Sequence, residues 1–595
     1  MKSILSYLKS VRFALGYAFR FAPGGTVLMS VLVVIENSLP YASSFLLGWL
    51  VNLIVSGAQS GLYKNVWYVL AFYAFVSAMP AILSNIRAYV GRRRMLTLQM
   101  EVDLEFLKMR EEVDIANYED PKFQDLLQRT FRNGPSPLHQ LGSAQIDIVG
   151  KSASLIVGTV LAIHFNPTIY FIVIAAAIPA FIMDIKYAGK SWSIWSKDSP
   201  EQRRLSDLRQ HLQYKTLLIE TKLLQSGNKL LSWIRKIFSD FAKVQLGLEK
   251  NRLWHTSLTD LLSLAGFAGG LVLIMKSVIA GETPVGTLVY MMATLSSVRN
   301  SIGSLLETVS GQYENHLIVK DMIEFMNTKP VIIESENPQQ LKLSSAPEIV
   351  FENVSFKYHN SDKYSLKKIN LTLRAGDNIG LVGNNGAGKT TLVKLLCRIY
   401  DPTEGRILIN GVDLREIATK EWWSYLAVMF QDYATYDFLV KDVIAIGRPD
   451  KPTNLTRVIE AAHTSQSHTF IEEWKGKYEH QLGVEFGGKE PSKGQRQKLS
   501  IAKTLYRQGM IMILDEPTAS VDAESESKIF DSIESLDKNT TALLISHDFS
   551  TISACDKIFV LDEAKLIEEG NHKELMAKKG LYAELYNLQA KRFKK

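Results

Sequence analysis

LVGNNGAGKTTL, which runs from Leu381 to Leu392, is the stretch around which this chain of 595 residues is organised. Four of its residues fit the pattern G-x-x-x-x-G-K-[ST]: Gly383, Gly388, Lys389 and Thr390. An apolar run (378–382) precedes it and a helix-like run (391–396) follows it. The sequence therefore predicts a strand, a glycine loop and a helix, which is the context that a phosphate-binding loop needs.

The chemistry of this loop follows from its residue types. Its glycines let the backbone curl so that N–H groups point inward at phosphate oxygens, and the following helix adds the positive end of its dipole. Lys389 supplies a positive charge for the β- and γ-phosphates, and the Thr390 hydroxyl is a ligand for Mg²⁺. We predict that ATP and Mg²⁺ bind here. The phosphate-binding residues are Gly383, Asn384, Asn385, Gly386, Ala387, Gly388, Lys389, Thr390 and Thr391.

Two later apolar runs end in residues suited to phosphate chemistry. Met510–Pro517 reads as a buried strand that delivers Asp515 and Glu516 at its carboxyl end, where α/β sheets bind ligands. Asp515 is expected to hold Mg²⁺, and Glu516 to polarise the attacking water. A second strand, Thr541–Ser546, delivers His547 to the same edge, where its imidazole is expected to bond the γ-phosphate.

Two further residues are weaker candidates when taken alone. Gln431 ends the strand-like run that begins at Tyr425, and its neutral amide is able to ligate Mg²⁺ or orient the attacking water. Tyr358 ends the strand-like run 348–358, where an aromatic ring is able to stack on adenine. The alternative for Tyr358 is a buried strand aromatic.

The first half of the chain has a different character. Overall hydrophobic content is an ordinary 46%, but residues up to about 310 carry long apolar runs. A charged and apolar segment, residues 11–22, suits an interfacial elbow helix. Six predicted membrane spans follow: Thr26–Val55, Val66–Val90, Ile146–Phe165, Ile169–Ile185, Leu258–Ile279 and Val285–Val309, the last of them more polar.

The distribution of Lys and Arg predicts the orientation of these spans. Basic residues cluster before the first span, after the second, as at 92–94, and after the fourth. The three opposite loops are short and carry almost none. By the positive-inside rule, the N-terminus, the two long charged loops and the C-terminal half face the cytoplasm of a multi-pass protein in the cytoplasmic membrane.

Each long inner loop contains a short interruption. The first is Asn117–Phe123 and the second is Glu220–Gly227, where Pro or Gly would turn the chain back toward the membrane. One interpretation is a contact between membrane helices and ATPase domain; the other is an ordinary helix–turn–helix on a solvated face.

Charged residues inside the predicted spans are costly, on the order of 2.5–3.5 kcal/mol each on insertion scales. Asp147 and Lys151 are four residues apart, which favours mutual pairing. Glu36, Arg299 and Glu307 have no partner near in sequence. They are candidates for a substrate pathway, with a structural ion pair between helices, or a position beyond the hydrocarbon, as the alternatives.

Net charge and cysteine content limit the remaining classes. The formal charge of +7 is not concentrated enough to favour nucleic acid as a partner. Two isolated cysteines, Cys397 and Cys555, form neither a disulfide framework nor a metal site, and they fit a reducing compartment.

With these motifs together, the chain resembles an ATP-binding cassette exporter of the half-transporter type. Residues Gly383–Thr390 resemble Walker A, Gln431 the Q-loop and Leu514–Glu516 Walker B with its catalytic glutamate. Ser520–Asp522 resembles the D-loop and His547 the switch histidine, while Tyr358 matches the adenine-stacking position. The resemblance implies coupling helices at the two interruptions. It also implies a domain-swapped dimer, with ATP between Walker A of one subunit and the signature loop of the other.

The signature loop departs from the family pattern LSGGQ. Here it reads Pro491-Ser-Lys-Gly-Gln495. The residues expected to bind nucleotide are kept: Ser492, Gly494 and Gln495. Lys493 replaces the first glycine, where it either obstructs a close backbone approach or adds a cation beside phosphate. An altered signature also occurs in asymmetric heterodimers of this family, so a second copy of the chain and a related half-transporter both stay open as partners.

The predicted fold class is a multidomain chain, with an all-α six-helix transmembrane domain followed by an α/β P-loop nucleotide-binding domain. The expected boundaries are 1–25 for the elbow, 26–326 for the membrane domain, 327–347 for a linker and 348–595 for the ATPase. The predicted function is ATP-driven export of a hydrophobic or amphipathic substrate, such as a peptide, lipid or drug-like molecule, across the cytoplasmic membrane by alternating access, with membrane lipid as a further partner. The alternative is an ATP-gated regulatory or channel-like membrane protein.

Overall fold

The protein is described by a computed structural model covering residues 2–60, 65–131, 134–195, 200–359, 361–534 and 539–593. The chain divides into two compact units. The first comprises Met1–Glu112 and Gln124–Thr328, and the second comprises Val113–Phe123 and Lys329–Lys595. The first unit is helical and the second is α/β, so the predicted fold class is confirmed.

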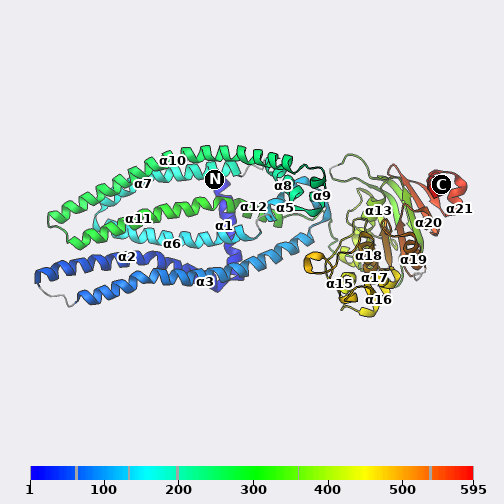
Figure 1. Ribbon diagram of the computed structural model, residues 1–595, viewed down its shortest axis with the longest axis horizontal. Coiled ribbons are helices and arrows are strands. Elements are labelled where there is room, and N and C mark those ends of the chain that lie inside the picture. The colour runs from blue at the N-terminus through cyan, green and yellow to red at the C-terminus, as the bar shows by residue number, and fades with distance from the viewer. Residues whose placement is uncertain are drawn as a thin grey trace. The chain divides into compact units, whose positions relative to one another are not determined.

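Six long helices dominate the first unit, and Figure 1 shows them running alongside one another. They are α2 (Pro23–Ser60), α3 (Val66–Glu112), α6 (Ser136–Phe165), α7 (Pro167–Trp195), α10 (Gly227–Ile279) and α11 (Val285–Gly311). Shorter helices accompany them: α1 (Lys2–Phe21), α5 (Pro121–Phe131, which straddles the division), α8 (Pro200–Gln213), α9 (Lys215–Leu223) and α12 (Tyr313–Met326).

Each predicted span lies inside one of the six long helices. Among the described residues, four helices are long and apolar enough to cross a membrane: α2, α3, α6 and α10. The apolar part of α7, Pro167–Ala180, is shorter, and α11 contains more polar residues. Membrane crossing by these last two helices therefore stays a prediction. The long polar extensions of α3 and α10 continue the same helices that carry the apolar stretches.

Small residues allow the helices of this unit to approach closely. A Cβ atom on Gly286 of α11 would lie 1.9 Å from the carbonyl oxygen of Gly48 on α2, so only glycine fits there. The Asn52 side chain accepts a hydrogen bond from the Gly286 N–H at 2.7 Å in the same contact. The close approach fixes α2 against α11.

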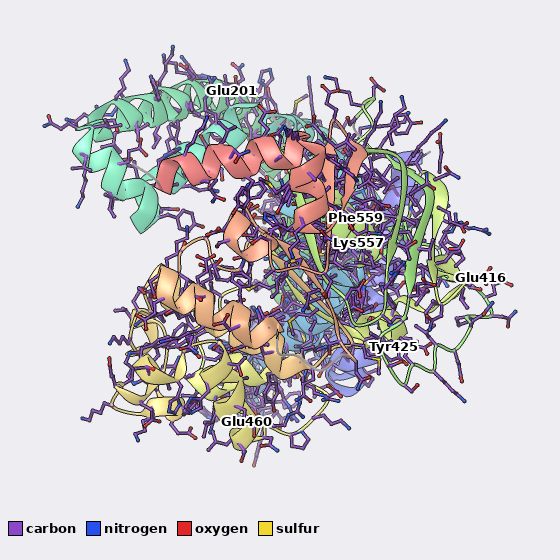
Figure 2. The ribbon with its side chains drawn as sticks, turned by 90° about the vertical axis from the view of Figure 1, so that its right-hand side faces the viewer. Glu201, Glu416, Tyr425, Glu460, Lys557 and Phe559 are labelled. Atoms are coloured by element: carbon purple, nitrogen blue, oxygen red, sulfur yellow. The ribbon has the colours of Figure 1, made fainter. Side chains whose placement is uncertain are left out.

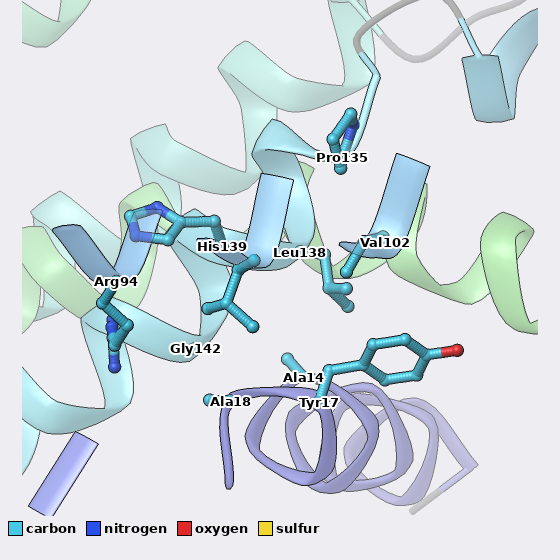
Figure 3. Close-up of a pocket in the computed structure, with 10 residues that line it drawn as sticks. Ala14, Tyr17, Ala18, Arg94, Val102, Pro135, Leu138, His139 and Gly142 are labelled. Atoms are coloured by element: carbon cyan, nitrogen blue, oxygen red, sulfur yellow. The ribbon is translucent and has the colours of Figure 1, made fainter. Parts of the chain in front are cut away.

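The predicted elbow segment forms α1, which packs against α3 and α6. Figure 3 shows Ala14, Tyr17 and Ala18 of α1 facing side chains of both helices across a small cavity of about 10 Å³. A space of this size holds about one water molecule, so the contact is closely packed. Arg94 lines the cavity from α3 and donates to the Ser143 hydroxyl of α6.

Two sheets form the framework of the second unit. An antiparallel four-stranded sheet has the order β2-β1-β4-β5, and a six-stranded sheet has the order β10-β9-β3-β8-β7-β6. The strands are β1 (Ile349–Phe356), β2 (Leu366–Leu373), β3 (Asn378–Gly383), β4 (Glu404–Ile409), β5 (Val412–Asp413), β6 (Leu426–Met429), β7 (Ile511–Asp515), β8 (Thr541–Ile545), β9 (Lys557–Asp562) and β10 (Lys565–Gly570). Lys557 and Phe559 mark β9 in Figure 2.

The six-stranded sheet explains why the motifs meet. β3 pairs in parallel with β8 and β9, and β7 pairs in parallel with β6 and β8. Parallel pairing brings the carboxyl ends of β3, β6, β7 and β8 to one edge. The central strands β3, β7 and β8 are almost wholly buried, as expected for parallel strands covered on both faces.

Helices complete the second unit: α4 (Ile115–Tyr118), α13 (Lys389–Leu396), α14 (Thr419–Ser424), α15 (Val440–Ala445), α16 (Leu455–Thr464), α17 (His468–Glu472), α18 (Lys493–Arg507), α19 (Ala523–Glu534), α20 (Phe549–Ile552), α21 (His572–Lys578) and α22 (Leu581–Phe593). Single 3₁₀ turns occur at Leu414–Glu416, Lys477–Glu479 and Val484–Phe486. Most of the helices between residues 435 and 507 are α15 to α18.

Both predicted interruptions are present. The first contains α4, whose preceding residue Asp114 accepts hydrogen bonds from the N–H groups of Val331 and Ile332 at 2.5 and 3.0 Å. Ala116 of α4 packs against the apolar core of the ATPase unit. For this interruption the contact with the ATPase unit is therefore confirmed. The second separates α9 from α10, which begins at Gly227.

Candidate functional site

The phosphate loop lies between β3 and α13, as the sequence predicts. Gly388, the residue before α13, has φ +106°, and a Cβ atom there would lie 2.6 Å from the Ser365 carbonyl oxygen. Both facts require glycine. The Lys389 side chain is curled back, and its Nζ donates to the carbonyl oxygens of Gly383 at 2.8 Å and Asn384 at 3.2 Å. The Asn384 amide itself donates to Asp562 at 3.1 Å.

Lys389 is a nearly buried cation beside two carboxylates. Only 9% of the residue is exposed. Burial lowers the pKa of its ammonium group, while the charges of Glu516 and Asp515 act in the opposite direction. A cation held with few water molecules interacts strongly with an incoming anion. The loop therefore provides a concentrated positive charge that suits a polyphosphate.

Thr390 and Asp515 form the predicted metal position. The Thr390 hydroxyl lies 3.3 Å from Oδ2 of Asp515, which is 2% exposed. Burial raises the pKa of the Asp515 carboxyl, and the Thr390 hydrogen bond partly opposes that shift. A buried carboxylate next to a hydroxyl is a pair of hard oxygen donors, and this donor set fits Mg²⁺ held mainly by phosphate and water.

Glu516 is the meeting point of the other predicted residues. Its Oε2 accepts a hydrogen bond from Nε2 of Gln431 at 2.9 Å, and its Oε1 lies 3.0 Å from Nε2 of His547. The residue has φ +51°, a conformation that is unusual for a side chain other than Gly, Asn or Asp. Its N–H donates to the Ile545 carbonyl of β8 at 2.8 Å, which holds the turn.

Gln497 is a site residue that the motifs did not identify. Its amide donates to the Glu516 carbonyl at 3.1 Å, and its side-chain oxygen accepts from the Ser520 N–H at 2.9 Å. It thus connects Glu516 to the D-loop-like segment. The signal was available in the sequence Gly494-Gln-Arg-Gln497, because α18 places Gln497 one turn after the predicted signature residues.

Tyr358 is packed against other aromatic rings, and adenine stacking on it stays a prediction. Its ring is half-buried and lies perpendicular to the rings of Phe356 and Tyr400, with centroids 5.0 and 5.5 Å away. Its hydroxyl lies 3.1 Å from the hydroxyl of Thr391 on the phosphate-loop helix. The Lys394 ammonium lies 5.4 Å from the ring centroid. The ring is therefore packed and still joined to the phosphate loop.

The signature-like residues form the N-terminus of α18. Ser492 and Gln495 make a reciprocal capping box, with distances of 3.2 and 2.9 Å. Gly494 is close to the D-loop-like segment, because a Cβ atom there would lie 2.6 Å from the Ser520 carbonyl oxygen. Lys493 is exposed. Among the described residues, no hydrogen bond joins this loop to the phosphate loop of the same chain.

The charged residues of the helical unit pair differently from the expected arrangement. The Asp147–Lys151 pairing is wrong: Asp147 lies 3.1 Å from Arg87 of α3. Arg87 also lies 2.7 Å from Glu36 of α2, so one guanidinium bridges two carboxylates. Lys151 instead donates to the Ser304 carbonyl at 2.9 Å and the Thr308 hydroxyl at 2.5 Å. Sequence spacing suggested the i,i+4 neighbour, but packing of α2, α3 and α6 supplied a better partner.

These contacts separate Glu36 from the other two candidates for a substrate pathway. Glu36 has the interhelical ion pair that was its structural alternative. Arg299 and Glu307 lie on α11, half-buried and exposed respectively. The described part of the chain shows no ion pair to either of them. A substrate contact for these two residues stays a prediction.

The geometry defines a class of protein: a P-loop ATPase unit on the same chain as a bundle of long apolar helices. The ABC transporter family model matches residues 366–519. Residues 366–519 thus form an ABC transporter domain, which lies on the same polypeptide as the helical unit.

Similar proteins extend this comparison beyond the matched residues. The chain is 26% identical to the subtilin transport ATP-binding protein SpaT of Bacillus subtilis, over 93% of this chain and 89% of that protein. It is 22% identical to the nisin transport ATP-binding protein NisT of Lactococcus lactis, over 94% and 93%. YgaD of Bacillus subtilis, provisionally described as a multidrug export ATP-binding/permease protein, is 33% identical over 52% of this chain and 53% of its own length.

A solved structure shares the fold over nearly the whole chain. It is a bacterial Atm1-family ABC exporter with ATP bound, which matches with a TM-score of 0.81 over 95% of this chain and 99% of that chain, at 22% identity. The likeness shows the same fold, with a helical domain and an α/β domain on one chain.

Proposed function

We propose that this chain is one half of an ATP-driven exporter that moves a peptide or another amphipathic molecule across the cytoplasmic membrane. The observation that carries the proposal is the contact set of Glu516 with Gln431 and His547, beside the Thr390–Asp515 pair. It is the arrangement needed to hydrolyse ATP, and the same chain supplies apolar helices long enough to span a membrane. The subtilin and nisin transport relatives support a peptide as substrate.

The roles of the residues follow from their chemistry. Lys389 and the loop N–H groups bind the phosphates. Thr390 and Asp515 would hold Mg²⁺, which would supply positive charge beside the phosphates. Glu516 accepts a proton from the attacking water, Gln431 orients the carboxylate, and His547 fixes its other oxygen and faces the γ-phosphate. Tyr358 supports the adenine.

The complete site requires a second subunit. In the described part of the chain, the signature residues Ser492, Gly494 and Gln495 form no hydrogen bond with the phosphate loop of their own chain, which supports a dimer that supplies them from the other subunit. The second subunit is another copy of this chain or a related half-transporter. The cluster Arg92–Arg94 after the second predicted span supports a cytoplasmic ATPase unit.

A second candidate function rests on Lys493. A long side chain replaces a glycine in the signature loop, which favours an ATP-gated regulatory protein with little turnover. The exporter is preferred because Glu516, Gln431 and His547 keep a hydrolytic arrangement that gating by binding alone does not need.

The test is ATPase activity of the purified chain in lipid nanodiscs, with its oligomeric mass measured on the same sample. A dimer that hydrolyses ATP, is inhibited by vanadate and loses activity in Glu516→Gln supports the exporter as a homodimer. A dimer that binds ATP without turnover supports the gated alternative. A monomer that gains activity only with a related half-transporter shows that the partner is a different chain.

A further inference from the structure

Lys394 occupies a distinctive place in the ATPase unit. It lies on α13, the short helix that begins with Lys389 and Thr390 of the phosphate loop. Its ammonium is 3.5 Å from Oε1 of Glu119, in the segment Val113–Phe123 that interrupts the helical unit and packs with the ATPase unit. One rigid helix therefore carries the phosphate ligands and a charge that contacts the chain coming from the membrane helices.

The same ammonium also lies against the proposed adenine platform. It is 5.4 Å from the ring centroid of Tyr358 and 5.7 Å from that of Tyr400. A cation at this distance from a ring centroid is attracted by the negative face of the ring. The Lys394 ammonium thus contacts two aromatic rings and the Glu119 carboxylate at the same time.

The surrounding contacts restrict how these groups move. The Tyr358 hydroxyl is tied to Thr391, and its ring is wedged between Phe356 and Tyr400. Burial raises the pKa of the Tyr400 phenol, and the negative charge of Glu119 adds to that rise. On the other side, Asp114 anchors the segment to the backbone at Val331 and Ile332. A shift of the Tyr358 ring therefore changes the distance between the Lys394 ammonium and the Glu119 carboxylate.

We propose that Lys394 is a positioning residue that transmits nucleotide binding at Tyr358 to the segment Val113–Phe123. The inference rests on the proposed function, because it takes Tyr358 as the adenine platform. When an adenine base stacks on Tyr358, it changes the position and the electrostatic field of the ring. The Lys394 ammonium, which lies against this ring, then shifts relative to the Glu119 carboxylate. Linkage is reciprocal, so loss of the Glu119 contact changes nucleotide affinity in turn.

The experiment measures amide hydrogen exchange of the full chain in lipid nanodiscs, with and without Mg²⁺ and the non-hydrolysable ATP analogue AMP-PNP. In the wild type, AMP-PNP is expected to slow exchange in residues 113–123. Lys394→Met is expected to weaken AMP-PNP binding about fivefold, as loss of roughly 1 kcal/mol implies. At saturating AMP-PNP it is expected to lose the change in exchange at 113–123.

Four further variants separate transmission from simple stability. Lys394→Arg keeps a cation and is expected to restore the response. Glu119→Gln, on a partly exposed side chain, is expected to lose the change in exchange at 113–123 while Lys394 is kept. The double variant Lys394→Met, Glu119→Gln is expected to bind AMP-PNP no more weakly than the weaker single variant. Lys420→Met removes an exposed charge elsewhere in the unit and serves as the matched control.

The outcomes are distinct. A wild-type response that survives in both Lys394→Met and Glu119→Gln overturns the proposal, as does the absence of any response in the wild type. If Lys394→Met does not fold, the Glu119→Gln result decides. ATP hydrolysis is assayed separately on the same nanodiscs: a chain without turnover whose exchange still responds to AMP-PNP rejects the proposed ATPase function and keeps the role of Lys394.

Discussion

His547 lies with its Nε2 3.0 Å from Oε1 of Glu516, although 31 positions separate the two residues in the chain. They come from the ends of two neighbouring parallel strands, β8 and β7. The other carboxylate oxygen of Glu516 is held by Gln431, after β6. Three adjacent strands thus fix one carboxylate on both of its oxygens, which is how a general base is held in a defined orientation.

Glu516→Gln is expected to abolish hydrolysis while nucleotide binding is kept. Glutamine has the same shape and retains contacts to Gln431 and His547, but it cannot accept a proton, so we expect turnover to fall by about 10²–10⁴. Steady-state ATPase assays and equilibrium ATP binding check this. Glu485→Gln, at a 3₁₀ turn elsewhere in the unit, is the control. Near-normal turnover in Glu516→Gln would remove this residue from the mechanism.

Lys389→Ala is expected to weaken nucleotide binding itself. The lysine is the nearly buried cation of the loop, and loss of charge-assisted hydrogen bonds of about 1.5–3 kcal/mol corresponds to an increase in Kd of about 10- to 150-fold. Titration with a fluorescent ATP analogue measures the change directly. Lys420→Ala should bind as the wild type does. An unchanged Kd in Lys389→Ala contradicts the phosphate-loop assignment.

Cys397 provides a test based on pKa. The residue directly follows α13, is buried, and burial raises the pKa of its thiol to about 12. Since only the thiolate reacts, its ionised fraction at pH 8 is about a thousandfold below that of an ordinary thiol. In a Cys555→Ser background we expect maleimide to leave the folded chain unlabelled at pH 8 and to label it in denaturant. The rate should rise with pH, towards about pH 12. Rapid labelling of the folded chain at pH 8 would show that the end of α13 opens readily.

The sequence predicted which side chains lie together at this edge of the sheet, because their arrangement is local or set by strand order. The phosphate loop needs only a strand, glycines and a helix, and these occur together within Leu381–Leu392. The carboxylate, amide and imidazole groups each follow an apolar strand, and parallel pairing brings strand ends to one edge. Gln497 was missed because its role depends on a contact with Ser520 that no spacing rule describes.

The charged residues of the membrane helices were harder to place for the opposite reason. Within a helix, each charged residue has a possible partner a few positions away in the sequence. An unpaired charge among apolar helices is costly, however, so pairing with a charge on another helix is also favourable. Arg87 is such a partner. It lies 51 positions after Glu36 and 60 positions before Asp147, so only the packing of three helices brings the groups together.

Arg87→Met is therefore expected to destabilise the helical unit. It leaves the Glu36 and Asp147 carboxylates without their shared partner, and because all three side chains keep some exposure we expect a loss of about 1–3 kcal/mol, less than for a fully buried pair. The thermal unfolding midpoint in nanodiscs measures this. Arg299→Met, on a residue with no ion pair among the described residues, is the matched control and should change the midpoint less.

Neutralising the partners distinguishes charge pairing from packing by Arg87. The triple variant Glu36→Gln, Arg87→Met, Asp147→Asn removes the uncompensated charges and should recover most of the midpoint, whereas Lys151→Met should not reproduce the Arg87→Met effect. If the triple variant is as unstable as Arg87→Met alone, the arginine stabilises α2, α3 and α6 through its apolar stem. If it recovers, Glu36 belongs to the framework of the membrane helices, and the search for substrate contacts moves to Arg299 and Glu307 of α11.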